Sequence, residues 1–225
     1  MRMVTPPKGE FSALPLNADG RNLAEQWVPQ APVPEGELCR SFGAPVVARL
    51  PGRIRISWQD DSILRLEFEA GKQTRLFHFS SPGAAPPESR GEPSWQGFSV
   101  ADWRHEPQKR GFGPADETTP VPGLGWTLHV VTSHLRPGFL RANGVPYGPH
   151  TTLTEYIRRF NAPNGDEWLV FINMVNDPEY LTLPYITTVQ FKREATPRWN
   201  PWPCEYIPPL QQAPAPGTVR EGEIG

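Results

Sequence analysis

The chain has 225 residues, of which 37% are hydrophobic, and this size and composition predict one domain with its own core. Its formal net charge of −2 lacks the overall basic character of a nucleic-acid-binding protein, so we expect no nucleic-acid partner. No apolar run approaches the ~20 residues that a membrane helix needs, so we expect no membrane span.

Residues 1–50 contain few strand signals and many turn residues. Asn22 to Trp27 follows Asp19-Gly20 and is compatible with one short helical turn. Several apolar side chains in this segment need burial: Phe11, Leu14, Leu16, Leu23 and Trp27. We therefore predict an ordered N-terminal arm that wraps the next domain, with a floppy tail as the alternative.

The next part of the chain predicts an antiparallel meander. Arg53–Gln59 alternates strictly, with Ile54, Ile56 and Trp58 on one face. Three further strands are expected at Ile63–Glu69, Thr74–Phe79 and Ser94–Trp103. Tight turns join the first three segments, which is typical of antiparallel neighbours. Residues 104–124 are rich in Pro and Gly, and a loop of this length is often a lid or a binding loop.

The last part of the ordered chain predicts four more strands in a row. Each is rich in β-branched or aromatic residues and is bounded by turn residues: Trp126–His134, Thr151–Phe160, Glu167–Asn176 and Tyr185–Arg193. The total of eight strands predicts an all-β fold, a closed antiparallel eight-stranded lipocalin-like barrel. Such a barrel is wide enough to hold side chains or one small ligand.

These elements divide the chain into three parts. We expect the N-terminal arm at 1–50, the β-barrel domain at 51–195 and a Pro-rich C-terminal tail at 196–225. The last ~15 residues are predicted to be disordered, because Pro, Gly and Glu dominate there.

The two cysteines, Cys39 and Cys204, lie in segments rich in Pro or Gly. No C-x-x-C motif and no Cys/His cluster accompanies them, so we expect no metal site. They either form one disulfide that ties the N-terminal arm to the C-terminal tail, or they remain two inert thiols. No phosphate-binding loop or dinucleotide motif is present, and we expect no cofactor.

Several segments together resemble a group of uncharacterised bacterial proteins that are usually predicted to be exported. The segments are Pro51–Asp61, Gln73–Phe79, Pro93–Gly97, Arg136–Tyr147, Leu153–Tyr156, Asp177–Leu181 and Trp199–Cys204. The resemblance implies export and a lipocalin-like (calycin-type) barrel, and it implies no catalytic residues. Met1–Val4 lacks the apolar core of a signal peptide, and the two methionines leave open that a leader was removed. We expect a periplasmic or secreted protein, with a cytoplasmic location as the alternative.

A site in this protein must be assembled from distant strands, because no nucleophile elbow or metalloprotease motif is present. His134 shares strand parity with Leu128 and Val130, which predicts a place on the inward side at the barrel mouth. A titratable group there is a candidate for acid–base chemistry or for anchoring a ligand. A hydrogen-bonded histidine at a strand end is the alternative.

Tyr156 and Glu155 are the other catalytic candidates, and they lie on opposite faces of one strand. If Tyr156 faces inward, its hydroxyl and Arg158 can hold a carboxylate or a phenol. If Glu155 faces inward, its carboxyl in an apolar barrel can act as a general acid or base. An outer ion pair of Glu155 with Arg159 or Arg55 is the alternative.

We expect the ligand contacts to come from aromatic and polar side chains of the strands: Arg158, Trp126, Trp168, Asn173, Trp58 and Phe77. Asn173 also fits as a hydrogen-bonding residue of the core. Three functions stay open. The barrel cavity binds a small hydrophobic or aromatic molecule. Alternatively, it is the active site of an isomerase, cyclase, lyase or hydrolase acting on such a molecule. In the third case, the barrel is filled and the protein is structural.

Overall fold

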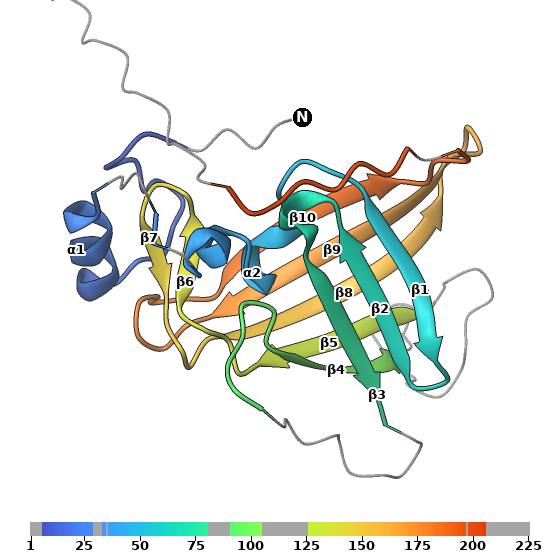
Figure 1. The fold of residues 1–225 in the computed structure, drawn as a ribbon, viewed down its shortest axis with the longest axis horizontal. Helices are drawn as coiled ribbons and strands as arrows, with labels where there is room; N and C mark the ends of the chain where they lie inside the picture. Colours follow the sequence, from blue (N-terminus) through green and yellow to red (C-terminus); the bar gives the residue numbers. More distant parts are fainter. Residues whose placement is uncertain are drawn as a thin grey trace, which may run out of the picture.

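The computed structural model of the chain describes residues 6–28, 33–34, 36–80, 91–104, 126–196 and 198–205. Within them, eight strands form one sheet that curls into a half-barrel (Figure 1). In pairing order they are β1 (Ile54–Asp60), β2 (Ile63–Phe68), β3 (Thr74–Phe79), β4 (Phe98–Arg104), β5 (Thr127–Ser133), β8 (Thr152–Asn161), β9 (Glu167–Asn176) and β10 (Tyr185–Lys192). The expected mostly-β fold with eight sheet strands is confirmed. The predicted lid or binding loop beyond Arg104 and the predicted disorder of the last ~15 residues lie outside the described residues.

One pairing differs from the expected antiparallel arrangement. β3 and β4 run parallel, with Phe77 opposite Ser99 and Phe79 opposite Ala101. The other neighbouring strands of the sheet are antiparallel. Parallel strands cannot be joined by a tight turn, and β4 begins only at Phe98 although β3 ends at Phe79, whereas tight turns join β1, β2 and β3.

The structure does not confirm the expected closure of the barrel. Pairing runs in one row from β1 to β10, and among the described residues no ladder joins these two outer strands. In Figure 1, β1, β2 and β3 cross the longer strands β8, β9 and β10, so that the sheet folds back over itself. A seam therefore remains between β1 and β10.

The inner face of the half-barrel follows from side-chain alternation along the strands. In β2, Leu64, Leu66 and Phe68 are buried, while the residues between them point to the outer face. In β8, the buried positions are occupied by Leu153, Glu155 and Ile157. The inner face is therefore apolar except at a few positions, of which Glu155 is the most deeply buried acid.

One end of the half-barrel is filled by segments outside the main sheet, which gather at the left of Figure 1. Leu140, Val145 and Tyr147 of this end pack into one buried cluster with Leu153 and Val175 of the sheet. The segments are α1 (Ala18–Gln26), the 3-10 helix η1 (Leu38–Ser41), the short helix α2 (Ala44–Val47) and a hairpin of β6 (Gly138–Arg141) and β7 (Val145–Tyr147). We call this end the plugged end.

The described part of the N-terminal arm packs on the plugged end. Phe11 and Leu14 are buried there. Asn143 holds the arm, because its Nδ2 donates hydrogen bonds to the carbonyl oxygens of Pro7 and Glu10 at 3.1 and 3.0 Å. These contacts favour the ordered arm over the floppy tail.

Helix α1 is longer than the single turn expected from Asn22. It begins at Ala18 because Asn17 caps it: the Asn17 Oδ1 accepts a hydrogen bond from the Gly20 backbone N–H at 2.9 Å. Gly20 is also needed for packing, since a Cβ atom there would lie 2.6 Å from the carbonyl oxygen of Tyr180.

A polar belt crosses the inner face between the plugged end and the rest of the core. Arg75 of β3 and Glu155 of β8 form a two-pronged ion pair, with Nη–Oε distances of 2.8 and 2.5 Å and almost no exposed surface. Arg75 also donates to the Thr132 Oγ1 at 3.0 Å, and that oxygen lies 2.7 Å from the Ser99 Oγ. β3, β4, β5 and β8 therefore meet in one buried network.

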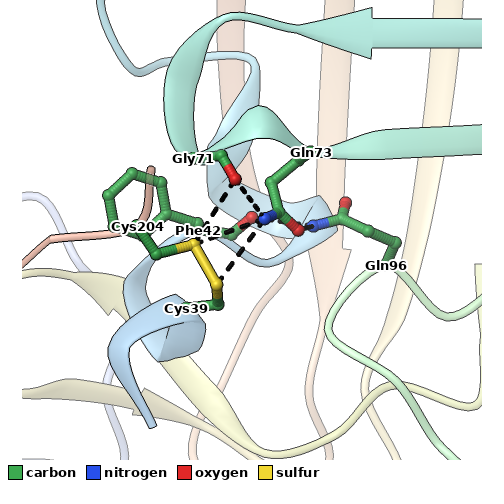
Figure 2. The surroundings of a disulfide bond; sticks show 6 residues. All are labelled: Cys39, Phe42, Gly71, Gln73, Gln96 and Cys204. Atoms are coloured by element: carbon green, nitrogen blue, oxygen red, sulfur yellow. Dashed lines mark hydrogen bonds between the residues drawn. A yellow bond between two sulfur atoms is a disulfide. The ribbon is translucent and has the colours of Figure 1, made fainter. Parts of the chain in front are cut away.

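The cysteines form a disulfide, which decides between the two alternatives left open by the sequence. The Cα atoms of Cys39 and Cys204 are 5.1 Å apart, and 165 positions separate them in the chain. Figure 2 shows Gln73 against the bond, with its Nε2 3.3 Å from the Cys204 Sγ and 2.7 Å from the Gly71 carbonyl oxygen. Gln96 in turn donates to the Gln73 Oε1 at 2.7 Å. The bond ties the N-terminal part of the chain to its C-terminal segment beside the sheet.

Candidate ligand cleft at the seam

A cleft of about 730 Å³ lies along the seam, between the edge strand β1 and strands β9 and β10. This volume falls within the range of about 300–1,000 Å³ that small-molecule sites occupy. The cleft exists because the two edge strands do not pair, so their inner side chains are left without a partner strand. Two smaller hollows, of about 330 and 380 Å³, lie beside Gln73 and His78 and beside Trp27 and Arg40.

The floor of the cleft is apolar. Ile54 and Ile56 of β1 lie opposite buried β2 residues in register, so both point to the inner face. Leu169 of β9 and Phe191 of β10 are paired across the other wall. Phe191 packs edge-on against Phe171 of the core, with ring centroids 5.5 Å apart. Ile56 nevertheless keeps 40% of its surface exposed, which is unusual for an inward-facing isoleucine.

The rim of the cleft carries a cluster of three charged residues at the end of β8, the start of β9 and the end of β10. Glu167 accepts hydrogen bonds from Arg159 on one carboxylate oxygen and from Arg193 on the other. The hydrogen bond from Arg193 is the main cause that lowers the pKa of Glu167 below its usual range. The backbone places these groups together, because the Arg193 N–H also donates to the Glu167 carbonyl oxygen at 2.8 Å.

A second ion pair bridges the seam. The Nε of Arg53, just before β1, donates to Glu194, just after β10, at 2.8 Å. Glu69 accepts a hydrogen bond from the Arg53 backbone N–H at 2.8 Å and one from the Asn200 N–H at 2.6 Å. β1, β10 and the C-terminal segment are therefore joined at this end although the strands do not pair.

The inner face continues from the cleft into a row of aromatic rings at the end of the half-barrel away from the plugged end. We call this end, which carries Trp58, Phe79 and Trp103, the open end. Trp58 of β1 lies 5.3 Å from Phe79 of β3, and Phe79 lies 6.0 Å from Trp103 of β4, measured between ring centroids. Trp58 is 53% exposed and Trp103 is 48% exposed. Tryptophan faces so exposed on a concave surface are suited to contact a flat apolar ligand.

The structure does not bring the three catalytic candidates together. His134 is exposed and lies just beyond β5 with a φ of 55°, where its Nδ1 is 3.0 Å from the Ser133 Oγ. The inner-face parity predicted for it ends with the strand, because the chain turns at this residue. Glu155 faces inward, and Tyr156 faces outward beside His129, with ring centroids 5.2 Å apart.

The structure places the six predicted ligand contacts in different parts of the half-barrel. Trp168 lines the cleft, Trp58 belongs to the aromatic row, and Trp126 is exposed just before β5. Phe77 and Asn173 are buried, and neither lines the cleft; Arg158 is half-buried on the outer face of β8. Their roles in binding stay predictions.

Of the two alternatives for Glu155, the structure shows the inward one, because its side chain is buried on the inner face of β8. Its partner is Arg75, rather than Arg159 or Arg55 of the expected outer ion pair. The pair joins β3 to β8 inside the buried network, and the catalytic roles of His134, Tyr156 and Glu155 stay predictions.

Sequence reasoning missed the residues that make the cleft charged, which are Arg159, Glu167 and Arg193. Arg159 follows Ile157 at inward parity, and this alternation was the one signal that could have found it. Glu167 and Arg193 lie at strand ends, where a turn and an inward position look alike in a sequence.

No group of three or more His, Cys, Asp or Glu suited to a metal ion occurs in the described ranges. None of the helices described here is both long enough and apolar enough to cross a membrane. On the outer face, the His129 Nδ1 lies 2.7 Å from the Asp102 Oδ1, and Asp102 is also bound by Arg104 at 2.7 Å.

No protein-family model matches this chain, and no curated protein or solved structure matches it either.

Proposed function

We propose that this protein binds a small hydrophobic or aromatic molecule in the seam cleft of its half-barrel. The observation that carries the proposal is the apolar inner face that β1 and β10 leave uncovered around a cleft of about 730 Å³. Burying such a surface against a ligand gains roughly 25 cal/mol for each Å² of apolar area removed from water. A filled structural barrel is disfavoured by the same volume.

We also propose that the half-barrel works as a lipocalin-like container. Eight strands are the number that encloses one small ligand in barrels of that kind. The Arg53–Glu194 bridge supports this idea, because it holds the two edge strands near each other at one end of the seam. A ligand lying across β1, β9 and β10 would complete the enclosure.

Export from the cytoplasm is part of the proposal and is supported by the Cys39–Cys204 bond, since structural disulfides persist in oxidising compartments. Thiol labelling of the protein in its native cells tests it. We expect no labelling of either cysteine before reduction, and full labelling without reductant would contradict export.

Binding is tested with Nile red, a neutral dye whose emission rises and shifts to the blue in an apolar site. We expect saturable binding to the wild-type protein, and about three- to tenfold weaker binding to Ile56→Ser, because that change removes apolar cleft surface. Ile172→Ser is the matched control, since Ile172 is similarly exposed at 43% but lies on the outer face of β9. No saturable signal with the wild-type protein, or equal losses in both variants, would overturn the proposal.

A further inference from the structure

At the rim of the cleft, Arg159, Glu167 and Arg193 form a cluster with two positive charges and one negative charge. Arg159 and Arg193 share a single carboxylate, that of Glu167. The other cations of the cleft pair with other carboxylates: Lys192 with Asp166 at 2.8 Å, and Arg53 with Glu194 at 2.8 Å and with Glu69 at 3.7 Å. One positive charge is therefore in excess at the Arg159–Glu167–Arg193 cluster.

Arg159 and Arg193 have N–H donors that none of their hydrogen bonds to described residues uses. Each arginine carries five N–H groups, and Glu167 occupies only part of this set. The side chains of Arg159 and Arg193 are 64% and 71% exposed, whereas that of Glu167 is 24% exposed. The carboxylate is therefore the most buried part of the cluster, and the two arginine side chains are largely exposed to solvent at the rim of the cleft.

The apolar floor begins beside this cluster. Leu169 lies opposite Arg159 in the β8–β9 register, and Phe191 lies opposite Leu169 in the β9–β10 register. A molecule that places a charged group at the arginines therefore places its apolar part over Leu169, Phe191 and Ile56. A guanidinium pairs well with a carboxylate because its donors match the two oxygens.

We infer that the ligand of the seam cleft is an amphipathic monoanion, an apolar molecule whose carboxylate is bound by Arg159 and Arg193. This inference rests on the proposed function and adds the head group to it. A single negative charge matches the single excess positive charge, whereas a dianionic phosphate monoester would leave one charge unbalanced.

The test compares two competitors of Nile red that differ only in the head group, decanoate and decanol. The quantity measured is the ratio of the concentrations at which each displaces half of the bound dye. In the wild-type protein we expect this ratio to favour decanoate, and we expect Arg193→Gln to reduce that preference about two- to fivefold, because exposed ion pairs contribute modestly. Arg65→Gln removes the same charge from a half-buried arginine on the outer face of β2 and should leave the ratio unchanged.

Glu167→Gln separates head-group binding from a structural role of the cluster. Removing this carboxylate leaves both arginines without their shared partner, so the preference for decanoate should increase rather than fall. A ratio that stays constant in both cleft variants, with Nile red still bound, overturns the inference and leaves the proposed function standing. Failure of the wild-type protein to bind Nile red, decanoate and decanol removes the proposed function itself.

Discussion

The two ends of the half-barrel differ in how far their apolar inner face is covered. At the plugged end, α1, α2 and the β6–β7 hairpin cover the inner face, and Leu140, Val145 and Tyr147 are almost fully buried. At the open end, the same inner face carries Ile56 and Trp58 with 40% and 53% of their surface exposed. Both ends have apolar inner positions, so the difference lies in what covers them. Among the described residues, the covering segments therefore decide which apolar positions of the inner face are buried.

The Arg75–Glu155 pair at the boundary of these two regions should give the largest effect. Glu155→Leu leaves the Arg75 guanidinium buried without its partner, and we expect a loss of about 3–5 kcal/mol in the free energy of unfolding. Urea denaturation followed by circular dichroism measures it. The double variant Arg75→Met with Glu155→Leu should recover most of the loss. A double variant as unstable as the single one would mean that the belt contributes more than this charge pair.

The disulfide at the plugged end should give the next largest effect. The bond closes a loop of 165 positions, for which chain entropy sets an upper value of about 5 kcal/mol, and residual structure in the unfolded chain reduces this to about 3 kcal/mol. Urea denaturation of the wild-type protein and of a variant with Cys39→Ser and Cys204→Ser measures this difference in the free energy of unfolding. We expect Nile red affinity to change little, because the bond lies outside the cleft lining. A large loss of binding would contradict the independence of the two regions.

Gly144 lies between β6 and β7, where the plugged end packs closely against Trp27. Its φ is +92°, and a Cβ atom there would lie 2.5 Å from the Trp27 side chain. Gly144→Ala should therefore destabilise the protein by about 1–3 kcal/mol, from backbone strain and from displacement of the indole ring. A red shift of the tryptophan emission would report the displaced ring. Gly165→Ala is the control for strain alone, because its φ is +84° and no atom lies within 4 Å of an added Cβ.

The strands of the sheet could be predicted from the sequence, whereas the plugged end and the cleft could not. Alternation in Ile63–Phe68 and the turns around it are local signals, and they gave β2 and its neighbours directly. The parallel contact of β3 with β4 and the Arg75–Glu155 pair depend on the meeting of distant segments, which periodicity does not contain. His134 illustrates the same limit, because parity along a strand says nothing about the residue at which the strand ends.

The smallest effect is expected from the charged rim of the open end, and its sign follows from the pKa of Glu167. Hydrogen bonds from Arg193 and the charge of Arg159 lower this pKa in the folded protein. The resulting stabilisation is present in full above the ordinary glutamate pKa of about 4.3, and it is lost as the pH falls below that value through the lowered one. The difference in unfolding free energy between the wild-type protein and Glu167→Gln should therefore shrink towards pH 3, and it should also shrink in high salt, since the cluster is exposed to solvent. Other acids with lowered pKa values, such as Asp60 and Asp166, titrate in both proteins, so this comparison largely removes their contribution. A difference that stays constant with pH would mean that Glu167 stabilises the rim by packing alone, and the charge argument for the cleft would then lose its support.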